Sequence, residues 1–468
     1  MQSIRQSLNN LCATALALIF AAAPTHAASL QAAMPMSPGL EEAIPPLNAL
    51  PSPTLPRTTL LDRLLVDAPT IREAQGMQQA AVQNGQILLD GTHEFVGQAQ
   101  VDQRRVVPPD APVATKYNEW QFLIQRQLRL PSQARADARM ANALSVTARA
   151  ELDSARQNLL SSLLVAWFNA QLAQADVALA KQNLLLIQEQ THALHRRESL
   201  GDASLLELEQ MQAEEGRAKS ALLLAQGMAD SQRAALAARY PALAADTTLS
   251  GQPDTTASLA MPALRAKALL TLVEQHSAAL EYGRATLQQA QSLVAQDEAM
   301  RTPQPTVGAY LGSDRGGQER VIGLQFSMPF GGPARVARER AALAQLDAAQ
   351  WRLHDIQAQT LAGFERLLIT AQSQAAGAVT QEQATQMQIQ ASTRMLRAYQ
   401  LGEVPISDWL MARRNALAAE QQMLSTRFNA AQSAALLKMD AGLLFDALPS
   451  TSNMPMPAIS PVQMQPQH

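Results

Sequence analysis

Few residues in this chain have the types and spacing that support catalysis. The sequence contains no glycine-rich phosphate loop and no His-carboxylate motif, and its one cysteine, Cys12, lies in an apolar run near the N-terminus. Nucleophilic catalysis and phosphate binding need such groups. The sequence therefore predicts a protein that is not an enzyme and that carries no cofactor.

Two histidines are the candidates for metal ligands. His192 and His195 are three residues apart, so on a helix they share a face, and imidazole binds several transition metals. Arg196 and Arg197 follow directly, and their positive charge opposes a bound cation. Solvated residues on a helix surface are the alternative, and we expect no resident metal.

Methionines gather towards the two ends of the chain, where their thioethers would suit Cu(I) or Ag(I). Ordinary residues in unstructured tails are the alternative interpretation, because the flanking sequence is rich in proline. The methionines concerned are Met34, Met36, Met454, Met456 and Met464.

The N-terminus has the pattern of a secretory signal peptide over residues 1–28. Arg5 supplies the positive start, Leu11–Ala23 the apolar run and Thr25–Ala27 a small-residue cleavage site. The run is shorter than the ~20 residues of a membrane-spanning helix. Because the residues before Cys12 do not form a lipoprotein motif, we expect cleavage without acylation and a mature chain without cysteine.

The composition favours long, closely packed helices over a thick globular core. Charged residues make up 16% of the 468 residues and aromatic residues 4%, whereas soluble domains average ~25% charged. The net charge of −3 comes with no basic stripe, so the sequence does not indicate nucleic-acid binding.

Two short segments have the composition of a tight reversal between long helices. Gly201 and Gly402 can adopt the left-handed conformation that ends a helix, and Pro405 suits the first turn of the next helix. The reversals are predicted at 199–204 and 399–405. Because the two Leu-Gly-acidic turns are roughly 200 residues apart, the chain is predicted to hold two copies of one helical hairpin.

The first hairpin has the spacing of a coiled coil. A helix predicted from Pro131 to Leu200 would be roughly 100 Å long, and the second arm, Ser204–Tyr240, is expected to return along it. Apolar residues on the first helix follow a seven-residue repeat, interrupted by one threonine, which favours left-handed supercoiling. The repeat consists of Leu159, Leu163, Ala166, Ala170, Ala173, Val177, Ala180, Leu184, Ile187, Thr191 and Leu194.

Four segments alternate apolar and polar residues with the period typical of β-strands. In the second segment only Leu123 and Arg126 break the pattern. The first two have about the 9–11 residues of a membrane-spanning strand, although an ordinary hairpin with one wet face has the same pattern. The predicted strands are 92–102, 119–130, 306–311 and 321–330.

These elements suggest two repeats, each made of a helix, two strands and a long helical hairpin. The first helix, 61–85, is expected to bury Leu61, Leu64, Leu65, Ile71 and Met77, and its counterpart is placed at about 262–297. The predicted parts are the signal peptide 1–28, an extended proline-rich arm 29–60, the first repeat 61–262, the second repeat 263–448 and a disordered tail 449–468.

Four strands with two-faced alternation cannot close a barrel, and open sheet edges are not tolerated in lipid. Several chains would have to contribute strands. Three chains give twelve strands, an even number within the range of outer-membrane barrels.

The turn Tyr399-Gln-Leu-Gly402, the following Ile406-Ser-Asp408-Trp-Leu410 and the strand Val321–Phe330 resemble TolC-type outer-membrane efflux channels. The order of elements is similar over residues 60 to 445. The resemblance implies a mixed α/β membrane protein: a trimer whose twelve-stranded β-barrel, four strands per chain, continues into a long α-helical coiled-coil barrel. The junction Leu130–Arg135 is similar to the heavy-metal (cobalt-zinc-cadmium) subgroup, although the Gly-Lys usual there is absent.

The resemblance also implies a function. The protein would be the outer-membrane channel of a tripartite, RND-type efflux system, docking to a periplasmic adaptor (membrane fusion) protein and an inner-membrane RND pump. It would passively conduct metal ions or small toxic compounds from the adaptor and pump across the periplasm and the outer membrane. A type I secretion duct of the same family and a periplasmic coiled-coil adaptor are the alternatives, and adaptors have one hairpin rather than two.

In this family the reversals form periplasmic tips that close the tube. The resemblance places the gate tyrosine on Tyr399, its acidic partner on Glu207 and a three-fold acidic ring on Asp408. Tyr399 is expected to hydrogen-bond Glu207, while Gly201 and Gly402 form the turns that meet the adaptor. The alternative is that these polar groups are only solvated helix ends.

Overall fold

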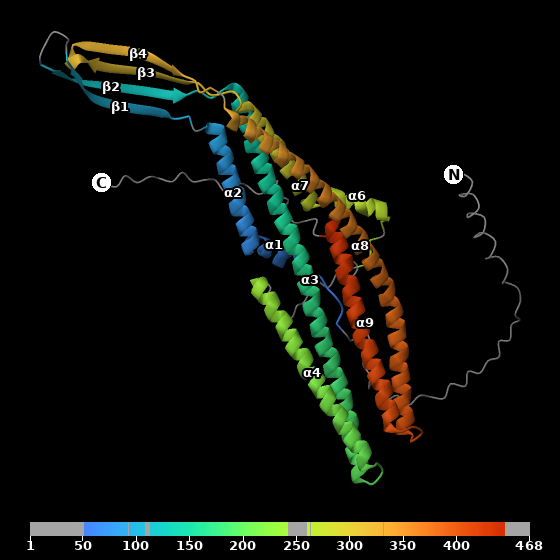
Figure 1. Cartoon of the computed structure of the whole chain (residues 1–468). Coiled ribbons are helices and arrows are strands. Elements are labelled where there is room, and N and C mark those ends of the chain that lie inside the picture. Colours follow the sequence, from blue (N-terminus) through green and yellow to red (C-terminus); the bar gives the residue numbers. More distant parts are fainter. Residues whose placement is uncertain are drawn as a thin grey trace, which may run out of the picture. The chain divides into compact units, whose positions relative to one another are not determined.

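Two long helices run through the described chain, and the other elements attach to them (Figure 1). Both α3 (Pro131–Ser199) and α8 (Pro333–Gln400) begin with proline at the first helical position, where the missing N–H costs nothing. All described residues belong to one compact unit, Pro46–His468. The computed structural model describes residues 51–91, 93–107, 113–241, 260–262, 264–330 and 332–444.

The element order repeats itself, as the sequence predicts. In each half a helix precedes two strands, a long helix, a sharp turn and a shorter return helix. The remaining helices are α1 (Thr58–Asp67), α2 (Pro69–Asp90), α4 (Leu205–Arg239), α6 (Ala266–His276), α7 (Ala278–Ala299) and α9 (Ile406–Asp440). The strands are β1 (Phe95–Val106), β2 (Thr115–Gln127), β3 (Thr306–Asp314) and β4 (Glu319–Ser327), with the short 3-10 turn η4 (Arg315–Gly317) before β4.

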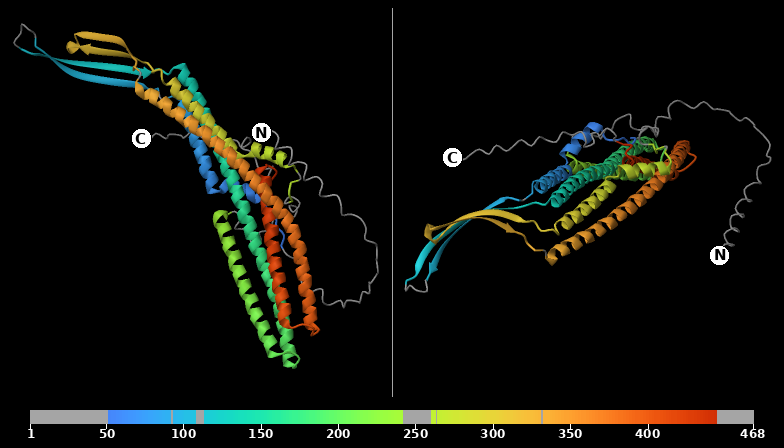
Figure 2. Two further views of the ribbon diagram at one scale, coloured as in Figure 1. Left: turned by 45° about the vertical axis from the view of Figure 1, so that its right-hand side comes forward. Right: turned by 90° about the horizontal axis from the view of Figure 1, so that it is seen from above.

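The helices form a layer that is one helix thick. Near the sheet, neighbours in the row are α2, α3, α7 and α8, and towards the turns they are α4, α3, α9 and α8. The view from above shows α2, α3, α7 and α8 side by side (Figure 2). A layer of this kind has two open faces and two open edges, so it has the form of a wall rather than of a closed globule.

The largest core cluster lies where α3, α9 and the segment before α1 meet. Trp167 and Phe168 on α3 pack there with Phe428 on α9, and the Trp167 indole N–H donates to the Thr54 carbonyl oxygen at 2.7 Å. Leu55 is buried in the same cluster. The end of the proline-rich arm, which directly precedes α1, is therefore held against α3 by Thr54 and Leu55.

The coiled-coil repeat predicted on α3 is confirmed as a packing seam. All of its members are buried or half-buried, and Thr191 satisfies its hydroxyl by donating to the Ile187 carbonyl oxygen at 2.9 Å. The buried members are Leu159, Leu163, Ala170, Ala173, Ile187, Thr191 and Leu194.

Helix α8 carries an exposed apolar stripe with a different period. Two sets of residues each repeat every 18 positions, which is about five turns of a straight helix. Such a stripe stays on one side of the helix without supercoiling. We call it the α8 stripe: Leu343, Leu361 and Val379, with Trp351, Ile369 and Met387, all exposed.

The four strands form one antiparallel sheet in the order β1-β2-β3-β4, and β1 and β4 each pair on one side only within the described chain. Residues paired across strands point to the same face. One face, the apolar face, carries Phe95, Val101, Trp120, Phe122, Ile124, Val307, Leu311, Ile322, Leu324 and Phe326, and the opposite, polar face carries Gln98, Gln100, Gln121, Gln125 and Gln325.

Both breaks in the strand pattern have a local explanation. Leu123 lies on the polar face, where it is nevertheless buried, beside Gly308. Arg126 lies on the apolar face, with its guanidinium 4.9 Å from the Phe95 ring centroid and its Nε donating to the His93 carbonyl oxygen at 2.8 Å. Each exception therefore has a partner within the sheet region.

Four predictions about elements need correction. The helix expected at 61–85 is two helices, α1 and α2, because Ala68 between them has an extended backbone. The helix expected at 262–297 is two helices, because Ser277 is extended and its hydroxyl accepts from the Leu280 N–H to begin α7. The amide oxygen of Gln157 on α3 also accepts from the Ala278 N–H at 3.0 Å. Met77 is exposed rather than buried. The strands extend further than expected at the end of the sheet far from the helices, because ladder pairing continues through polar residues. At the other end, residues 93–94, 128–130 and 328–330, predicted as strand, lie outside the ladders.

Other predictions fall outside the described residues. These are the signal peptide with Cys12, most of the arm 29–60, the methionines of both ends, the segment 242–259 between the repeats and the tail 449–468.

One described helix, α3, contains an 18-residue window apolar enough to cross a membrane by length and composition, with mean hydropathy 1.2. Half of that window is buried within the chain. Core packing therefore accounts for its apolar character.

Candidate functional site

The two helical reversals have the same backbone geometry. At the first, the Asp202 N–H donates to the Arg197 carbonyl oxygen at 2.8 Å, and at the second the Glu403 N–H donates to the Ala398 carbonyl oxygen at 2.9 Å. Such bonds define the Schellman motif that ends a helix. Gly201 has φ +82° and Gly402 φ +77°, the left-handed region that glycine adopts at low cost.

Both glycines lie on open surface. A Cβ added at Gly201 or at Gly402 would meet no atom within 4 Å. Their role in the turn is therefore backbone conformation rather than close packing, and the surface around them is accessible to a partner.

An apolar cluster joins the two hairpins next to the turns. It brings together α3, α4, α8 and α9, so the two copies of the hairpin pack against each other and not only internally. The rings of Tyr399 and Trp409 stack within it, with centroids 6.4 Å apart and an interplanar angle of 12°. We call it the tip cluster: Ile187, Leu194, Met211, Ala218, Leu396, Tyr399, Ile406, Trp409 and Leu410.

Tyr399 lies in this cluster with its hydroxyl buried and without a hydrogen-bond partner among the described residues. Arg197, from the first hairpin, places its guanidinium 5.8 Å from the Tyr399 ring centroid. Burial raises the pKa of Tyr399, the charge of Glu207 raises it further, and Arg197 opposes both. The phenol is therefore neutral and lies within the electrostatic reach of Glu207.

Glu207 makes its observed hydrogen bonds within its own helix. One carboxylate oxygen accepts from the Ser204 N–H at 3.0 Å, while the Glu207 N–H donates to the Ser204 hydroxyl at 3.2 Å. This reciprocal pair is a capping box, which stabilises the start of α4. No hydrogen bond joins Glu207 to Tyr399 among the described residues, so the structure places the two groups near each other without the predicted bond.

Asp408 is exposed in the first turn of α9, where a negative charge interacts favourably with the helix N-terminus. Its Oδ1 accepts from the Ser407 hydroxyl at 3.2 Å. No hydrogen bond joins Asp408 to Tyr399 or Glu207 in the part of the chain that the structure describes, and Asp408 does not belong to the tip cluster.

An ion pair further along the hairpins also joins the two repeats. Glu214 on α4 accepts from the Arg414 guanidinium on α9 at 2.6 Å and from Arg217 at 3.1 Å. Burial alone would raise the pKa of Glu214, but the hydrogen bonds and charge of Arg414, followed by those of Arg217, lower it below its ordinary value. The carboxylate is therefore ionised at neutral pH.

A buried polar group lies beside this ion pair. The Arg413 Nε on α9 donates to the Asn183 amide oxygen on α3 at 2.9 Å, and an Arg413 terminal nitrogen lies 3.2 Å from a Glu420 carboxylate oxygen. Burial raises the pKa of Glu420, against the opposing effect of Arg413. These contacts join α3 to α9, and removing one partner would leave a buried charge uncompensated.

The two candidate metal ligands are not brought into a site. His192 and His195 are both exposed on α3. Among the described residues, no three or more His, Cys, Asp or Glu side chains lie close enough together to hold a metal ion.

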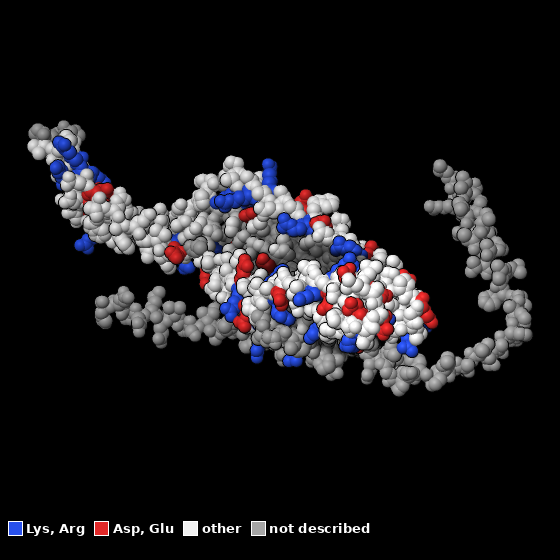
Figure 3. All heavy atoms as spheres, turned by 90° about the horizontal axis from the view of Figure 1, so that it is seen from below, with Lys and Arg blue, Asp and Glu red and all other residues white. Residues whose placement is uncertain are grey.

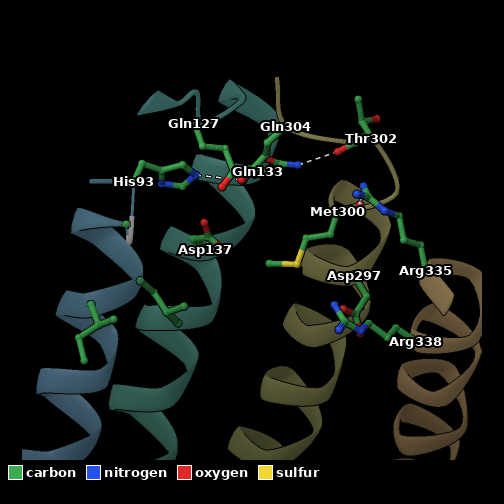
Figure 4. Close-up of a pocket in the computed structure, with 13 residues that line it drawn as sticks. His93, Gln127, Gln133, Asp137, Asp297, Met300, Thr302, Gln304, Arg335 and Arg338 are labelled. Atoms are coloured by element: carbon green, nitrogen blue, oxygen red, sulfur yellow. Dashed lines mark hydrogen bonds between the residues drawn. The ribbon is translucent and has the colours of Figure 1, made fainter. Parts of the chain in front are cut away.

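A second polar network lies at the junction of the strands and helices. His93 Nε2 and the Gln304 amide oxygen are 3.0 Å apart, and the Gln304 amide donates to the Gln133 amide oxygen at 2.6 Å. Gln133 donates in turn to the Thr302 carbonyl oxygen at 2.9 Å. Figure 4 shows these side chains around a cavity of about 310 Å³.

Asp137 anchors the same junction from α3. Its carboxylate accepts from Arg129 at 2.6 Å and from the Gln296 amide at 2.6 Å. Arg129 also donates to the Leu88 carbonyl oxygen at 2.6 Å. The network therefore ties α2, α3, α7 and the ends of the strands into one joint.

Several of these residues are not apparent from the sequence alone. The Glu214–Arg414 pair and the Asn183–Arg413 pair join positions in different repeats, and no spacing rule connects them. The duplication is the one sequence signal that could have indicated them. If two equivalent hairpins pack together, the return helix of one, here α9, has to lie against the other hairpin.

Comparison of the sequence with family models found no match, and comparison with curated proteins found none either. The sequence resemblance noted above therefore depends on element order and short motifs.

Comparison with solved structures shows that the chain shares the fold of outer-membrane channels. The outer-membrane channel OprN superimposes with a TM-score of 0.68 at 18% identity, over 82% of this chain and 89% of that one. CusC, described with conformational changes accompanying transmembrane channel formation, gives 0.66 at 16%, over 88% and 99%. The outer membrane protein VceC from Vibrio cholerae gives 0.64 at 20%, over 82% and 95%. The predicted long helical hairpins with four strands per chain are thus confirmed, and the strands form one antiparallel sheet. The trimeric twelve-stranded barrel stays a prediction.

Proposed function

We propose that this chain is the outer-membrane channel of a tripartite efflux system and that it assembles as a trimer. The observation that carries this proposal is that both layers of the chain have open edges. The sheet has edge strands β1 and β4, and the edge helix α8 carries the exposed α8 stripe. Three copies would pair the sheet edges into a twelve-stranded barrel and continue the helices as a tube. The fold shared with OprN, CusC and VceC supports the proposal.

The two faces of the sheet fit this arrangement. The apolar face would meet lipid, and its rows from Phe95 to Val101 span about 20 Å, close to the ~25 Å apolar band of outer-membrane barrels. The polar face would line a water-filled lumen. The helices would cross the periplasm and place the two turns at the inner end.

The tip cluster would be the gate. Tyr399 has a buried hydroxyl that forms no hydrogen bond with a described residue, which costs about 1–3 kcal/mol, and Glu207 has a carboxylate oxygen not used by its capping box. A rotation that joins them would give a charge-assisted bond on the order of 1.5–3 kcal/mol. We propose that this bond stabilises the closed tip, and that Asp408 from three chains forms an acidic ring selecting cations.

The open turns at Gly201 and Gly402 would meet a periplasmic adaptor, which in turn would connect the tube to an RND pump. A partner that binds the open tip better than the closed tip shifts the equilibrium towards opening. The cargo would be metal ions or small toxic compounds, selected by the pump rather than by this chain.

The experiment is conductance of the purified mature protein in planar bilayers, together with its mass in detergent. We expect a heat-sensitive trimer with a small closed conductance. The variants Tyr399→Phe and Glu207→Gln should each raise that conductance, whereas the control Tyr240→Phe, whose hydroxyl lies 2.7 Å from Ser162 away from the turns, should leave it unchanged. A strictly monomeric protein would refute the channel, and equal conductance in all variants would refute the gate.

The cargo is tested separately. A host that lacks the gene should become sensitive to metal ions or to small organic toxicants in a growth panel. Unchanged growth on the whole panel, with loss of a secreted polypeptide instead, would favour the secretion duct.

A further inference from the structure

The end of the sheet that lies furthest from the helices carries charged residues on both of its faces. Figure 3 shows Lys and Arg gathered at this end, beside a smaller area of Asp and Glu. The strand pairing assigns these residues to faces. Arg105 pairs with Lys116, and Arg320 pairs with Ser313, which itself pairs with Trp120. All three cations therefore lie on the apolar face.

Polarity rises in steps along this face towards the sheet end. The row of Val101 and Trp120 ends the apolar band, and the next row on the same face pairs Gln103 with Asn118, whose amides are hydrogen-bonded at 3.1 Å. Arg105 and Lys116 form the row after that on β1 and β2, whereas Arg320 on β4 lies in the row of Trp120, which pairs with Ser313. This order, from hydrocarbon to amide to cation, matches the order of acyl chains, polar linkage and phosphate in a lipid leaflet.

The three cations have no counter-ion within the described chain. Arg105, Lys116 and Arg320 are exposed, and none of them forms an ion pair or a hydrogen bond with a described residue. Like charges directly opposite each other in a sheet are destabilising. The Arg105–Lys116 pair therefore raises the energy of the sheet unless an anion from outside lies between them.

The polar face at the same end shows the opposite pattern. Asp102 and Glu119 are also a like-charge pair, but Arg104 lies 3.0 Å from the Glu119 carboxylate. Arg315 likewise lies 3.0 Å from Glu319. On the polar face one member of each like-charge pair therefore has a cationic partner, whereas neither Arg105 nor Lys116 has an anionic partner among the described residues.

The other end of the apolar band differs again. Its cation, Arg126, is engaged by the Phe95 ring and the His93 carbonyl oxygen. Among the described residues of the apolar face, cations without a partner therefore lie at the far edge of the band, whereas Arg126 at the other edge has one. A membrane with phosphorylated lipid concentrated in one leaflet would complement this asymmetry.

We propose that Arg105, Lys116 and Arg320 form a binding surface for the phosphate groups of an anionic glycolipid in the outer leaflet, with Trp120 at the level of its polar linkage. The proposal rests on the proposed function, because it requires the sheet to span the outer membrane with its far end outside. Guanidinium and ammonium groups both bind phosphate, arginine in bidentate geometry.

The test is binding of bisphosphorylated lipid A to the full mature protein in detergent, measured by native mass spectrometry and by competition with a fluorescent lipid A. Cations near an anionic membrane surface contribute about 1 kcal/mol each, which corresponds to about a fivefold change in affinity. We therefore expect Arg105→Gln with Lys116→Gln to weaken binding about 25-fold. The matched control, Arg104→Gln with Arg315→Gln, removes the same charge at the same end and should change binding less than twofold.

Two further arms identify the source of the phosphate. Lipid A stripped of both phosphates should bind the wild-type protein as weakly as bisphosphorylated lipid A binds the double variant. Inorganic phosphate at equal concentration should not compete. Equal binding by wild type and double variant, full competition by inorganic phosphate, or an equal loss in the control would each overturn the proposal.

Insertion into liposomes and the heat-sensitive oligomer are recorded for every variant. If all variants insert and assemble while lipid A affinity is unchanged, the lipid surface is wrong and the channel stands. If the wild type neither inserts nor assembles, the proposed function is wrong, and the lipid surface fails with it.

Discussion

The two helical hairpins have nearly the same lengths but very different environments. α3 and α8 have 69 and 68 residues, and α4 and α9 have 35 each. Yet α3 and α9 are rich in buried side chains, whereas α8 has few for its length and α4 has only Leu208, Met211, Glu214, Ala218 and Leu236. The difference follows from position, since α3 and α9 lie inside the row of helices and α4 and α8 at its edges. The duplication thus accounts for the equal lengths of the corresponding helices, whereas the position of each helix in the layer determines which of its faces are buried.

The largest expected effect would come from disrupting the edge rather than the interior. Ile369→Asp places a charge in the α8 stripe. If the stripe is buried in the proposed trimer, we expect loss of the trimer with retained helical content, because burying an unpaired carboxylate is costly. Size-exclusion chromatography with light scattering measures the assembly. Gln345→Asp, exposed on the opposite side of α8, is the matched control. A stable trimer of the Ile369 variant would show that the stripe is not an interface.

Two tryptophans allow the interior and the edge of the helix layer to be compared within one chain. Trp167 on α3 is fully buried and Trp351 on α8 is 66% exposed. Trp167→Ala should lower the free energy of unfolding by about 3–5 kcal/mol, and Trp351→Ala by less than ~0.5 kcal/mol, under conditions where the chain is monomeric. Denaturant unfolding followed by circular dichroism measures both. Equal losses would contradict the assignment of α3 to the interior.

The end of α9 offers a pH-dependent comparison. Burial raises the pKa of Asp440 from 3.8 to about 6, while a hydrogen bond from Gln157 opposes the shift. Because the pKa of Asp440 is higher in the folded state, the protonated group contributes its full stabilisation below pH 3.8. That contribution is lost as the pH rises through about 6. The loss is about 3 kcal/mol at pH 8.

Asp440→Asn should therefore stabilise the protein at pH 8 and have little effect at pH 4, as measured by thermal unfolding in detergent. Asp230→Asn, on the exposed side of α4, is the control and should show no such dependence. A stabilisation that does not change with pH would contradict the raised pKa.

The smallest expected effect concerns the ion pair between the hairpins. Glu214→Gln should weaken their contact by about 1 kcal/mol, because Arg414 is half exposed and solvent screens the pair. Since the pKa of Glu214 is lowered, the contribution is present above 4.5 and is lost as pH falls through the lower folded value. Hydrogen exchange of α4 measures the contact. The control Arg233→Gln, which breaks a more exposed pair within α4, should change exchange less.

Features set by local chemistry could be predicted from the sequence. The bounds of the first long helix follow from Pro131 and Gly201, and the two faces of the strands follow from alternation. The break at Ser277 could not be predicted, because part of its stabilisation comes from Gln157 on α3.

In the candidate gate, too, local features could be predicted from the sequence, whereas packing between hairpins could not. Tyr399 and Glu207 were placed at the turns by resemblance, and the turns lie where they were predicted. The stacking of Tyr399 on Trp409 and the position of Arg197 over the ring depend on how two hairpins pack. Packing between distant segments of the chain leaves no periodic signal in the sequence.

The unpaired edges of β1 and β4 have a consequence for biogenesis. A single chain would expose two rows of backbone donors and acceptors, which are templates for strand addition by any other polypeptide. If the chain forms the proposed trimer, another protein has to shield those rows until assembly. Overproduction should then yield aggregates before it yields more trimer.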